Sequence, residues 1–230
     1  MREEGTTNGR SIAILSPVER RRRNRDEMIT AILDASRDVM REEGAAALNL
    51  NEVARRVGVR TPSLYTYFSS KAQLYDALFL LGIELFAERI RNALSEPLPL
   101  WERIKVSFET YMNFAHESPE LYRLVFERPV PGFTPSQRSM EASWSLLAWG
   151  NAQIEEACRA EGITPPIRFN QVTDLILALQ HGLTSLHVAN EPDLPPGAGR
   201  FGALIPAAVE LLKSAWGTEL TAPTEDLKEE

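Results

Sequence analysis

The sequence predicts an all-α protein of about nine helices. Apolar residues recur at helical spacing through most of the 230 residues, no segment shows the alternation of a strand, and turn residues separate the periodic runs. Hydrophobic residues make up 43% of the chain and charged residues 25%, which is typical of a folded globular protein. We therefore expect an N-terminal module of three helices followed by a larger helical domain.

The first predicted helix covers residues 26–43. Gly44 follows it as a C-cap, because glycine adopts the backbone conformations that end helices. The residues before it, 1–18, are expected to form a disordered N-terminal arm. The apolar residues that define the helical period are Met28, Ile32, Ala35, Val39 and Met40.

Two short helices follow within residues 49–68. Asn49 precedes Glu52 by three residues, the spacing of a capping box, and this second helix ends before Gly58. Thr61 and Pro62 are predicted to be the N-cap and first position of a third helix, because proline lacks only an amide hydrogen that would be unpaired there. Its buried side is predicted to carry Leu64 and Phe68.

A long connecting helix is predicted over residues 71–94. Ser70 and Gln73 have the spacing of a capping box at its start, and leucines continue the period to its end. Its length suits a helix that links two domains. Beyond it, turn residues separate further predicted helices, and Ser118-Pro119 and Thr134-Pro135 resemble N-caps followed by proline. These helices cover residues 100–116, 119–127, 135–161, 168–190 and 201–215.

Charge divides the chain into two regions. Residues 16–75 hold eleven Lys or Arg against eight Asp or Glu, whereas residues 96–230 hold ten against nineteen. The run "ERRRRNR" at 19–25 contributes most of the basic excess. The basic region lies around the short third helix, in a chain whose net charge is −7.

Several classes of protein find no support in the sequence. The single cysteine, Cys158, excludes an intrachain disulfide, and the three histidines have no metal-ligand spacing, so we expect neither a metal nor a cofactor. No glycine-rich phosphate loop or nucleophile motif appears, and we expect no enzyme. Because no run of about 18 apolar residues occurs, we expect no membrane partner and a cytoplasmic location.

The two short helices have the pattern of a helix-turn-helix, whose second helix enters the DNA major groove. With Leu64 and Phe68 facing inward, hydroxyl-bearing residues of the third helix remain to contact base edges or phosphates. Tyr65 and Lys71 suit phosphate contacts. Helix pairs with tyrosines also pack inside α-proteins that never bind DNA, so a helical adaptor or ligand-binding protein remains the alternative.

Residues 48–78, "LNLNEVARRVGVRTPSLYTYFSSKAQLYDAL", closely resemble the DNA-binding module of TetR-family transcriptional regulators. They share the Ala-x-x-x-Gly-Val turn, the Leu-Tyr-x-x-Phe recognition helix and the lysine that follows. The resemblance implies base or groove contacts from Thr61, Pro62 and Ser63. It also implies backbone contacts from Tyr65, Thr66, Tyr67 and Lys71. The family usually has threonine where this chain has Asn49, which can still cap the helix and donate to a phosphate.

The resemblance implies a domain plan and a function. It divides the chain into a DNA-binding domain (19–70), a connecting helix (71–94), a regulatory and dimerisation domain (95–217) and an acidic tail (218–230). The expected protein is a homodimer that binds double-stranded DNA at a near-palindromic operator. It acts as a repressor that a small, largely apolar effector releases. "QHG" at 180–182 resembles the Trp-His-Gly segment of one group of regulatory domains in this family, with Gln180 replacing the tryptophan.

Candidate residues for the effector site and the dimer interface come from the second half of the chain. The effector candidates are aromatic or flexible residues near its centre: Phe108, Met112, Tyr122, Phe126 and Trp144. The dimer candidates form apolar stripes on helices 168–190 and 201–215. They are Val172, Leu175, Leu179, Gly182, Leu183, Leu186, Leu204, Ala208 and Leu211. His181 is expected to be a hydrogen-bonded histidine between helices.

Overall fold

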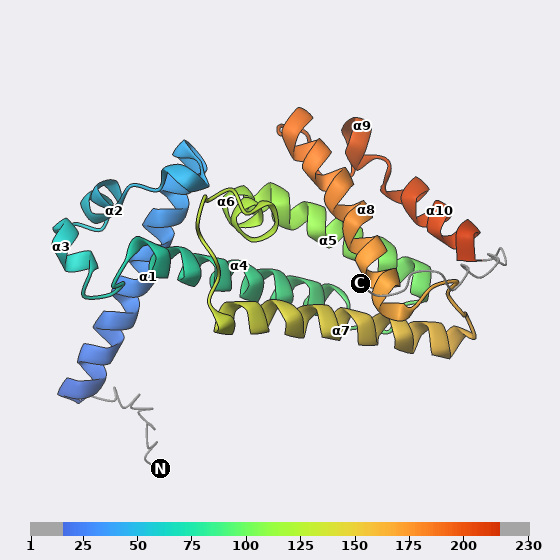
Figure 1. Ribbon diagram of the computed structural model, residues 1–230, viewed down its shortest axis with the longest axis horizontal. Coiled ribbons are helices and arrows are strands. Elements are labelled where there is room, and N and C mark those ends of the chain that lie inside the picture. The colour runs from blue at the N-terminus through green and yellow to red at the C-terminus, as the bar shows by residue number, and fades with distance from the viewer. Residues whose placement is uncertain (1–15, 217–230) are drawn as a thin grey trace, which may run out of the picture.

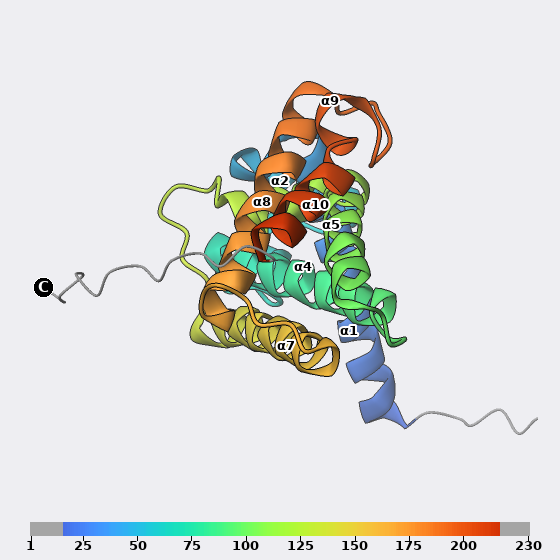
Figure 2. The ribbon, with the colours of Figure 1, turned by 90° about the vertical axis from the view of Figure 1, so that its right-hand side faces the viewer.

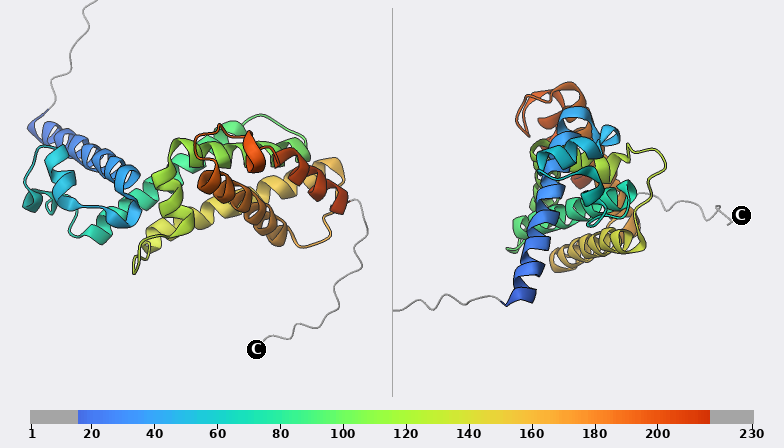
Figure 3. Two further views of the ribbon diagram at one scale, coloured as in Figure 1. Left: turned by 90° about the horizontal axis from the view of Figure 1, so that it is seen from above. Right: turned by 90° about the vertical axis from the view of Figure 1, so that its left-hand side faces the viewer.

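Every secondary-structure element in the part of the chain that the structure describes is helical. The structure is a computed structural model that describes residues 16–216. The predicted all-α class is therefore confirmed. Helices α1 to α3 form a module at one end of an elongated molecule, and the remaining helices form a body at the other end (Figures 1 and 3).

Helix α1 (Pro17–Glu43) begins before its predicted start. The Ser16 hydroxyl accepts from the Glu19 amide at 3.2 Å, and the Glu19 carboxylate accepts from the Ser16 amide at 2.7 Å, which together make a capping box. Pro17 and Val18 are thus helical, although they fall in the predicted arm; residues 1–15 of that arm lie outside the described residues. The predicted C-cap is confirmed, since the Gly44 amide donates to the Met40 carbonyl.

The short elements of the module follow: the 3₁₀ turn η1 (Ala45–Ala47), α2 (Leu50–Arg56) and α3 (Thr61–Leu64). Asn49 caps α2 by accepting from the Asn51 amide at 3.0 Å. Gly58 has φ 72°, a left-handed conformation that favours glycine and lets the chain turn between the two helices.

Helix α4 (Lys71–Ala93) runs from the module into the body, as predicted (Figure 1). Ser70 caps it by accepting from the Gln73 amide at 3.1 Å. At Gly82 the backbone of α4 approaches its neighbours so closely that an added Cβ would lie 2.7 Å from a methyl of Val125. Glycine is therefore required for this packing.

The body contains α5 (Leu100–Glu117), α6 (Pro119–Tyr122), the π-helical turn η2 (Arg123–Glu127), α7 (Gln137–Glu161), α8 (Phe169–Asn190), α9 (Gly199–Gly202) and α10 (Ile205–Trp216). Figure 2 shows α7 and α10 on opposite sides of this body. The predicted helix 119–127 is thus an α-helical turn followed by a π-helical one, and the predicted helix 201–215 is two helices.

Three predicted caps are wrong in detail. The Glu52 carboxylate binds arginines instead of the Asn49 backbone, so the capping box of α2 is absent. Arg60 rather than Thr61 is the N-cap of α3. Ser136 rather than Thr134 caps α7, by accepting from the Ser139 amide at 3.3 Å.

Two clusters of buried apolar residues hold the chain together. One is continuous from α1, α2 and α3 through α4 to Tyr111, Tyr122 and their neighbours. The other joins α5, α7, α8 and α10. Because the first cluster crosses from the module into the body, the two parts are packed together rather than joined only by a linker.

Candidate nucleic-acid interface and internal cavity

Helix α3 ends at Leu64, earlier than predicted, and the helix together with the turn that follows it carries the exposed residues predicted to meet DNA. Leu64 and Phe68 are buried at 3% and 8% exposure, which turns the rest of the helix outward. Pro62, Ser63, Tyr65 and Thr66 are exposed, with Tyr65 exposed by 51%. The burial of two residues four apart therefore presents a small, hydroxyl-bearing surface of the kind that fits a major groove.

The predicted contacts at the start of this face are partly engaged within the protein. The Thr61 hydroxyl donates to Asn51 Oδ1 at 2.8 Å and so ties α3 to α2. Its methyl group and oxygen lone pairs remain for a groove contact. Asn49 is exposed, and its oxygen caps α2, so only its amide hydrogens are available to a phosphate.

Aromatic and basic side chains pack together at the other end of α3. Arg25 donates from Nη1 to the Thr66 carbonyl at 3.2 Å, and its guanidinium lies 5.2 Å from the centre of the Tyr67 ring. Lys71 Nζ lies 5.5 Å from the centre of the Tyr75 ring. Cation–π contacts of this kind hold the charged groups beside the exposed residues of α3 and its following turn.

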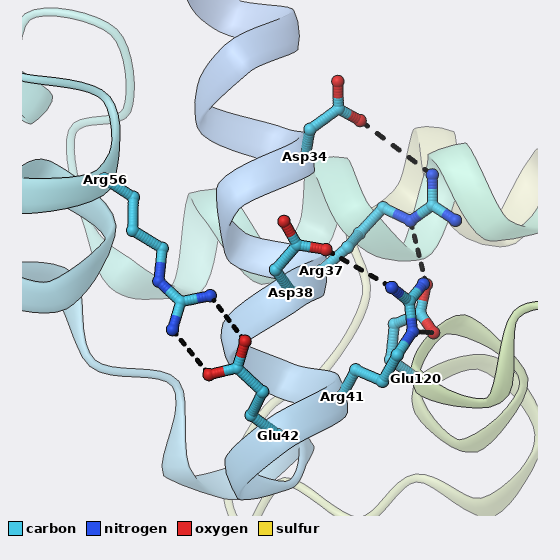
Figure 4. Close-up of polar contacts among 7 residues, drawn as sticks. All are labelled: Asp34, Arg37, Asp38, Arg41, Glu42, Arg56 and Glu120. Atoms are coloured by element: carbon cyan, nitrogen blue, oxygen red, sulfur yellow. Dashed lines mark hydrogen bonds and ion pairs between the residues drawn. The ribbon is translucent and has the colours of Figure 1, made fainter.

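The basic residues of α2 are ion-paired within the module. Arg55 and Arg56 both donate to the Glu52 carboxylate, and Arg56 also contacts Glu42 at 2.6 and 2.9 Å (Figure 4). Hydrogen bonds from Arg55 and then Arg56 lower the pKa of Glu52 to about 2. These arginines brace the helix-turn-helix, so the basic run there is not wholly available for phosphates.

A buried carboxylate joins the module to the body. Glu120 in α6 is 2% exposed and accepts from Arg37 Nε at 2.9 Å and from Arg41 Nη2 at 2.9 Å, both on α1 (Figure 4). Arg41 Nε also donates to it, at 3.2 Å. A displacement of α6 would therefore strain or break these ion pairs with α1.

An elongated cavity of about 370 Å³ lies between α4, α5, η2, α7 and α8. Its wall is mainly apolar, and α4 contributes a residue from each of four successive turns: Phe79, Ile83, Phe86 and Ile90, with Leu94 beyond them. Val125 and Phe126 of the π-helical turn also line it. The cavity thus touches both α4 and the segment that carries Glu120.

Only two of the five predicted effector residues line this cavity: Phe126 and the 56% exposed Trp144. Phe108 and Met112 belong to the core between α5, α8 and α10, because they face the other side of α5. Tyr122 is fully buried, and its hydroxyl lies 3.2 Å from His181 Nδ1. The structure does not bring these three residues to the cavity.

His181 lies between helices as predicted, with the Tyr111 hydroxyl 3.0 Å from its Nδ1 atom. Burial raises the pKa of Tyr111 and of Tyr122 above the ordinary tyrosine value. Both hydroxyls therefore stay protonated and can donate hydrogen bonds.

Sequence reasoning missed the polar residues of the cavity. Arg103 on α5 and Gln180 on α8 both line it, and each has a buried side-chain atom without a hydrogen-bond partner. Gln180 is 8% exposed. A glutamine within the apolar pattern of helix 168–190 was a usable signal for Gln180, whereas Arg103 resembles any charged residue beside an apolar stripe.

Most of the predicted dimer residues lie on the outer faces of α8 and α10. Leu175, Leu186, Leu204 and Leu211 are exposed by 41%, 46%, 43% and 72%. Gly182 is also exposed, and Leu179, Leu183 and Ala208 are half-buried against the core. Val172 is 1% exposed and packs inside the protomer, so it is not available to a partner.

Residues 16–216 show neither a metal-binding cluster nor a membrane-spanning helix. No group of three or more histidine, cysteine or acidic residues in that range is placed to hold a metal ion. No helix in the same range has the length and apolar character needed to cross a membrane.

Comparisons with known proteins match the module first. Residues 32–78 match the family described as bacterial regulatory proteins, tetR family. The HTH-type transcriptional activator FasR of Mycolicibacterium smegmatis is 33% identical over 103 residues, covering 45% of this chain and 47% of FasR. The nucleoid occlusion factor SlmA of Marinomonas sp. is 24% identical over 169 residues, covering 73% and 86%. The match thus spans about half the length of FasR.

Solved structures extend the likeness of fold to the body. Transcriptional regulator FadR from Bacillus subtilis, solved in complex with stearoyl-CoA, superimposes with a TM-score of 0.64 at 17% identity. This alignment covers 81% of this chain and 98% of FadR.

The helix-turn-helix module is thus similar to that of bacterial regulatory proteins of the tetR family. The likeness of the rest of the chain to solved regulators is one of fold, because those structures are less than 25% identical to it.

Proposed function

We propose that this protein is a ligand-responsive transcriptional repressor that binds a near-palindromic operator as a homodimer. The observation that carries the proposal is the outward face of α3, where Pro62, Ser63 and Tyr65 are exposed above a buried Leu64. Small and hydroxyl-bearing side chains on a short helix and its following turn suit base-edge contacts, and Lys71 at the start of α4 suits a phosphate.

The apolar faces of α8 and α10 support the homodimer. Four leucines exposed by 41% or more form a surface that a lone protomer would leave in water. Pairing these two helices with their copies would bury that surface in a four-helix interface. Two copies of α3 would then meet successive major grooves about 34 Å apart, or a multiple of that distance.

The cavity supports the effector switch. It borders α4, which leads to the reading helix, and the π-helical turn next to Glu120. A ligand that binds two arrangements of these helices unequally would change operator affinity. A coupling of about 1 to 3 kcal/mol corresponds to roughly a 5-fold to 150-fold change, and operator DNA must change ligand affinity by the same factor.

The test begins with selection of bound fragments from genomic DNA, followed by titration of the preferred site. Lys71→Ala should weaken binding to all sequences and flatten the salt dependence by about one phosphate's share. Ser63→Ala should instead change base preference. Lys105→Ala, on an exposed side chain of α5, is the matched control. Failure to retain any fragment, or a Lys71→Ala variant with unchanged affinity and salt slope, refutes the interface.

A reporter gene downstream of the selected site tests the sign of regulation. Repression predicts higher expression when the protein is deleted. Lower expression on deletion would make it an activator, which is what the name of its relative FasR says of that protein.

A further inference from the structure

The cavity holds two cationic side chains and no anionic one. Arg103 and Arg128 are the charged residues of its wall, and no aspartate or glutamate contributes to it. Within residues 16–216 neither guanidinium has a carboxylate within ion-pair distance. A cation that borders an apolar space without a counter-charge is unfavourable, and a ligand anion would relieve that cost.

Arg103 is only partly satisfied. Its Nη1 atom donates to Gln153 Oε1 at 2.6 Å, while its Nε–H group is buried and has no partner. The hydroxyl groups of Ser107 and Thr173 in the cavity wall do not accept a hydrogen bond from the Arg103 Nε–H group; each donates to a carbonyl of its own helix. The Nε–H group is therefore a donor that an acceptor inside the cavity would complete.

Arg128, unlike Arg103, has an exposed side chain and a left-handed backbone conformation. Its φ of 49° is the one positive value among non-glycine residues in the described part of the chain. Water already solvates an exposed guanidinium, so a bound anion gains less from it than from the buried donor of Arg103. We expect Arg128 to be less important for affinity.

We propose that the cavity selects an amphipathic anion: an unbranched alkyl chain that ends in a free carboxylate held by Arg103. This proposal rests on the cavity being the effector site. The apolar wall along four turns of α4 would hold the chain, and the carboxylate would accept the free Nε–H. A cavity of about 370 Å³ holds about 12 non-hydrogen atoms at ~30 Å³ each, the share of a water molecule in the liquid.

Decanoate is the probe, because it has about that number of non-hydrogen atoms, and decanol is its neutral match. Binding to the full chain is measured by calorimetry and by the shift in melting temperature, without DNA. We expect decanoate to bind roughly 10-fold to 100-fold more tightly than decanol, because hydrogen bonds between charged groups are stronger than neutral ones. Equal affinity for the two compounds would overturn the proposal.

Variants assign the role to one arginine. Arg103→Met keeps an unbranched, flexible side chain but removes the guanidinium, and it should abolish the preference for decanoate while decanol still binds. Arg103→Lys should recover part of the preference for decanoate over decanol, since lysine restores the positive charge without the planar guanidinium. Arg128→Met, the matched control, should keep the preference for decanoate. A preference that survives Arg103→Met, or that is lost only in Arg128→Met, overturns the assignment.

Two further results separate this inference from the proposed function. Tighter binding of decanoyl-CoA than of decanoate, dependent on Arg128, would show that the free acid is the wrong class. If the protein does not bind DNA but prefers decanoate in calorimetry, the proposed function is refuted and the ligand inference stands. If it binds DNA but shows no preference for decanoate, only the ligand inference is refuted.

Discussion

Several side chains predicted or positioned to contact DNA are engaged in hydrogen bonds within the protein. Arg56 illustrates this, because it lies in the basic stretch beside the reading helix yet its donors are engaged by Glu42 and Glu52. Similarly, the Thr61 hydroxyl donates its hydrogen bond to Asn51. The residue type alone therefore does not tell which cations or hydroxyls are available to DNA.

The Glu52 cluster predicts a pH dependence of stability. Its pKa is lowered from 4.5 to about 2 in the folded protein, so the stabilisation is complete above the unfolded value and is lost as pH falls toward the folded value. The melting temperature should fall between about pH 4.5 and 2, and Glu52→Gln should reduce that fall. Glu155→Gln, in an exposed pair on α7, is the control. Equal slopes in all three proteins would contradict the assignment.

Gln180 predicts a cavity-filling variant. Gln180→Trp places a larger apolar side chain in the cavity and removes the unpaired Oε1 atom. Ligand binding should be lost, while the melting temperature should be unchanged or higher, because unpaired buried acceptors are costly. Calorimetry with decanoate and thermal unfolding measure the two effects, and Gln137→Trp at an exposed position of α7 is the control. Retained binding would place the ligand elsewhere.

At the scale of elements, the contact between α6 and α1 is one direct connection from the cavity side of the body to the helix-turn-helix module. Phe126 and Val125 line the cavity, and the α6 turn just before them carries Glu120. Helix α4 is a second route, since it lines the cavity and its first residue, Lys71, follows α3 closely in the chain. The two routes make different predictions for a mutation at Glu120.

Glu120→Gln removes the charge that two arginines of α1 share. We expect a loss of about 1–3 kcal/mol in unfolding free energy, because hydrogen bonds to charged groups contribute about that much. The ligand-induced change in operator affinity should also shrink toward none, as measured by DNA titration with and without ligand. Asp38→Asn, in an exposed pair with the same Arg41, should do neither. An unchanged ligand effect would assign the coupling to α4 instead.

At the scale of the whole molecule, the exposed apolar faces of α8 and α10 lie in the body, away from the reading helix at the other end (Figure 1). A dimer formed through these faces would leave both copies of α3 accessible to DNA. The elongated shape would therefore place the proposed dimer, ligand and DNA sites at different positions along the molecule (Figure 1).

Gly182 gives a test of the dimer. It is exposed, and a Cβ added there meets nothing within 4 Å in the protomer. Gly182→Glu should therefore fold as a protomer but place like charges across a two-fold interface, which is unfavourable. Light scattering at micromolar concentration should show a dimer for the unmodified protein and for Ala160→Glu, and a monomer for Gly182→Glu. A monomeric unmodified protein would refute the interface.

The sequence by itself determined the helical class, most boundaries of the long helices and the two short helices of the helix-turn-helix module. These depend on signals local in the chain, such as the helical period, Gly44 and Gly58, and the spacing of Leu64 and Phe68. Residues up to four apart are neighbours on one helix, so their pattern shows which side is buried.

The tertiary structure alone decided what each buried side meets. Phe108 and Phe126 are both aromatic residues on buried helix faces, yet one packs in the core and the other lines the cavity, because the neighbouring helices differ. Glu120 reads as an ordinary surface residue after a proline, but packing of α6 on α1 places it between two arginines. Contacts between residues about 80 positions apart are fixed by helix packing, and no local pattern encodes them.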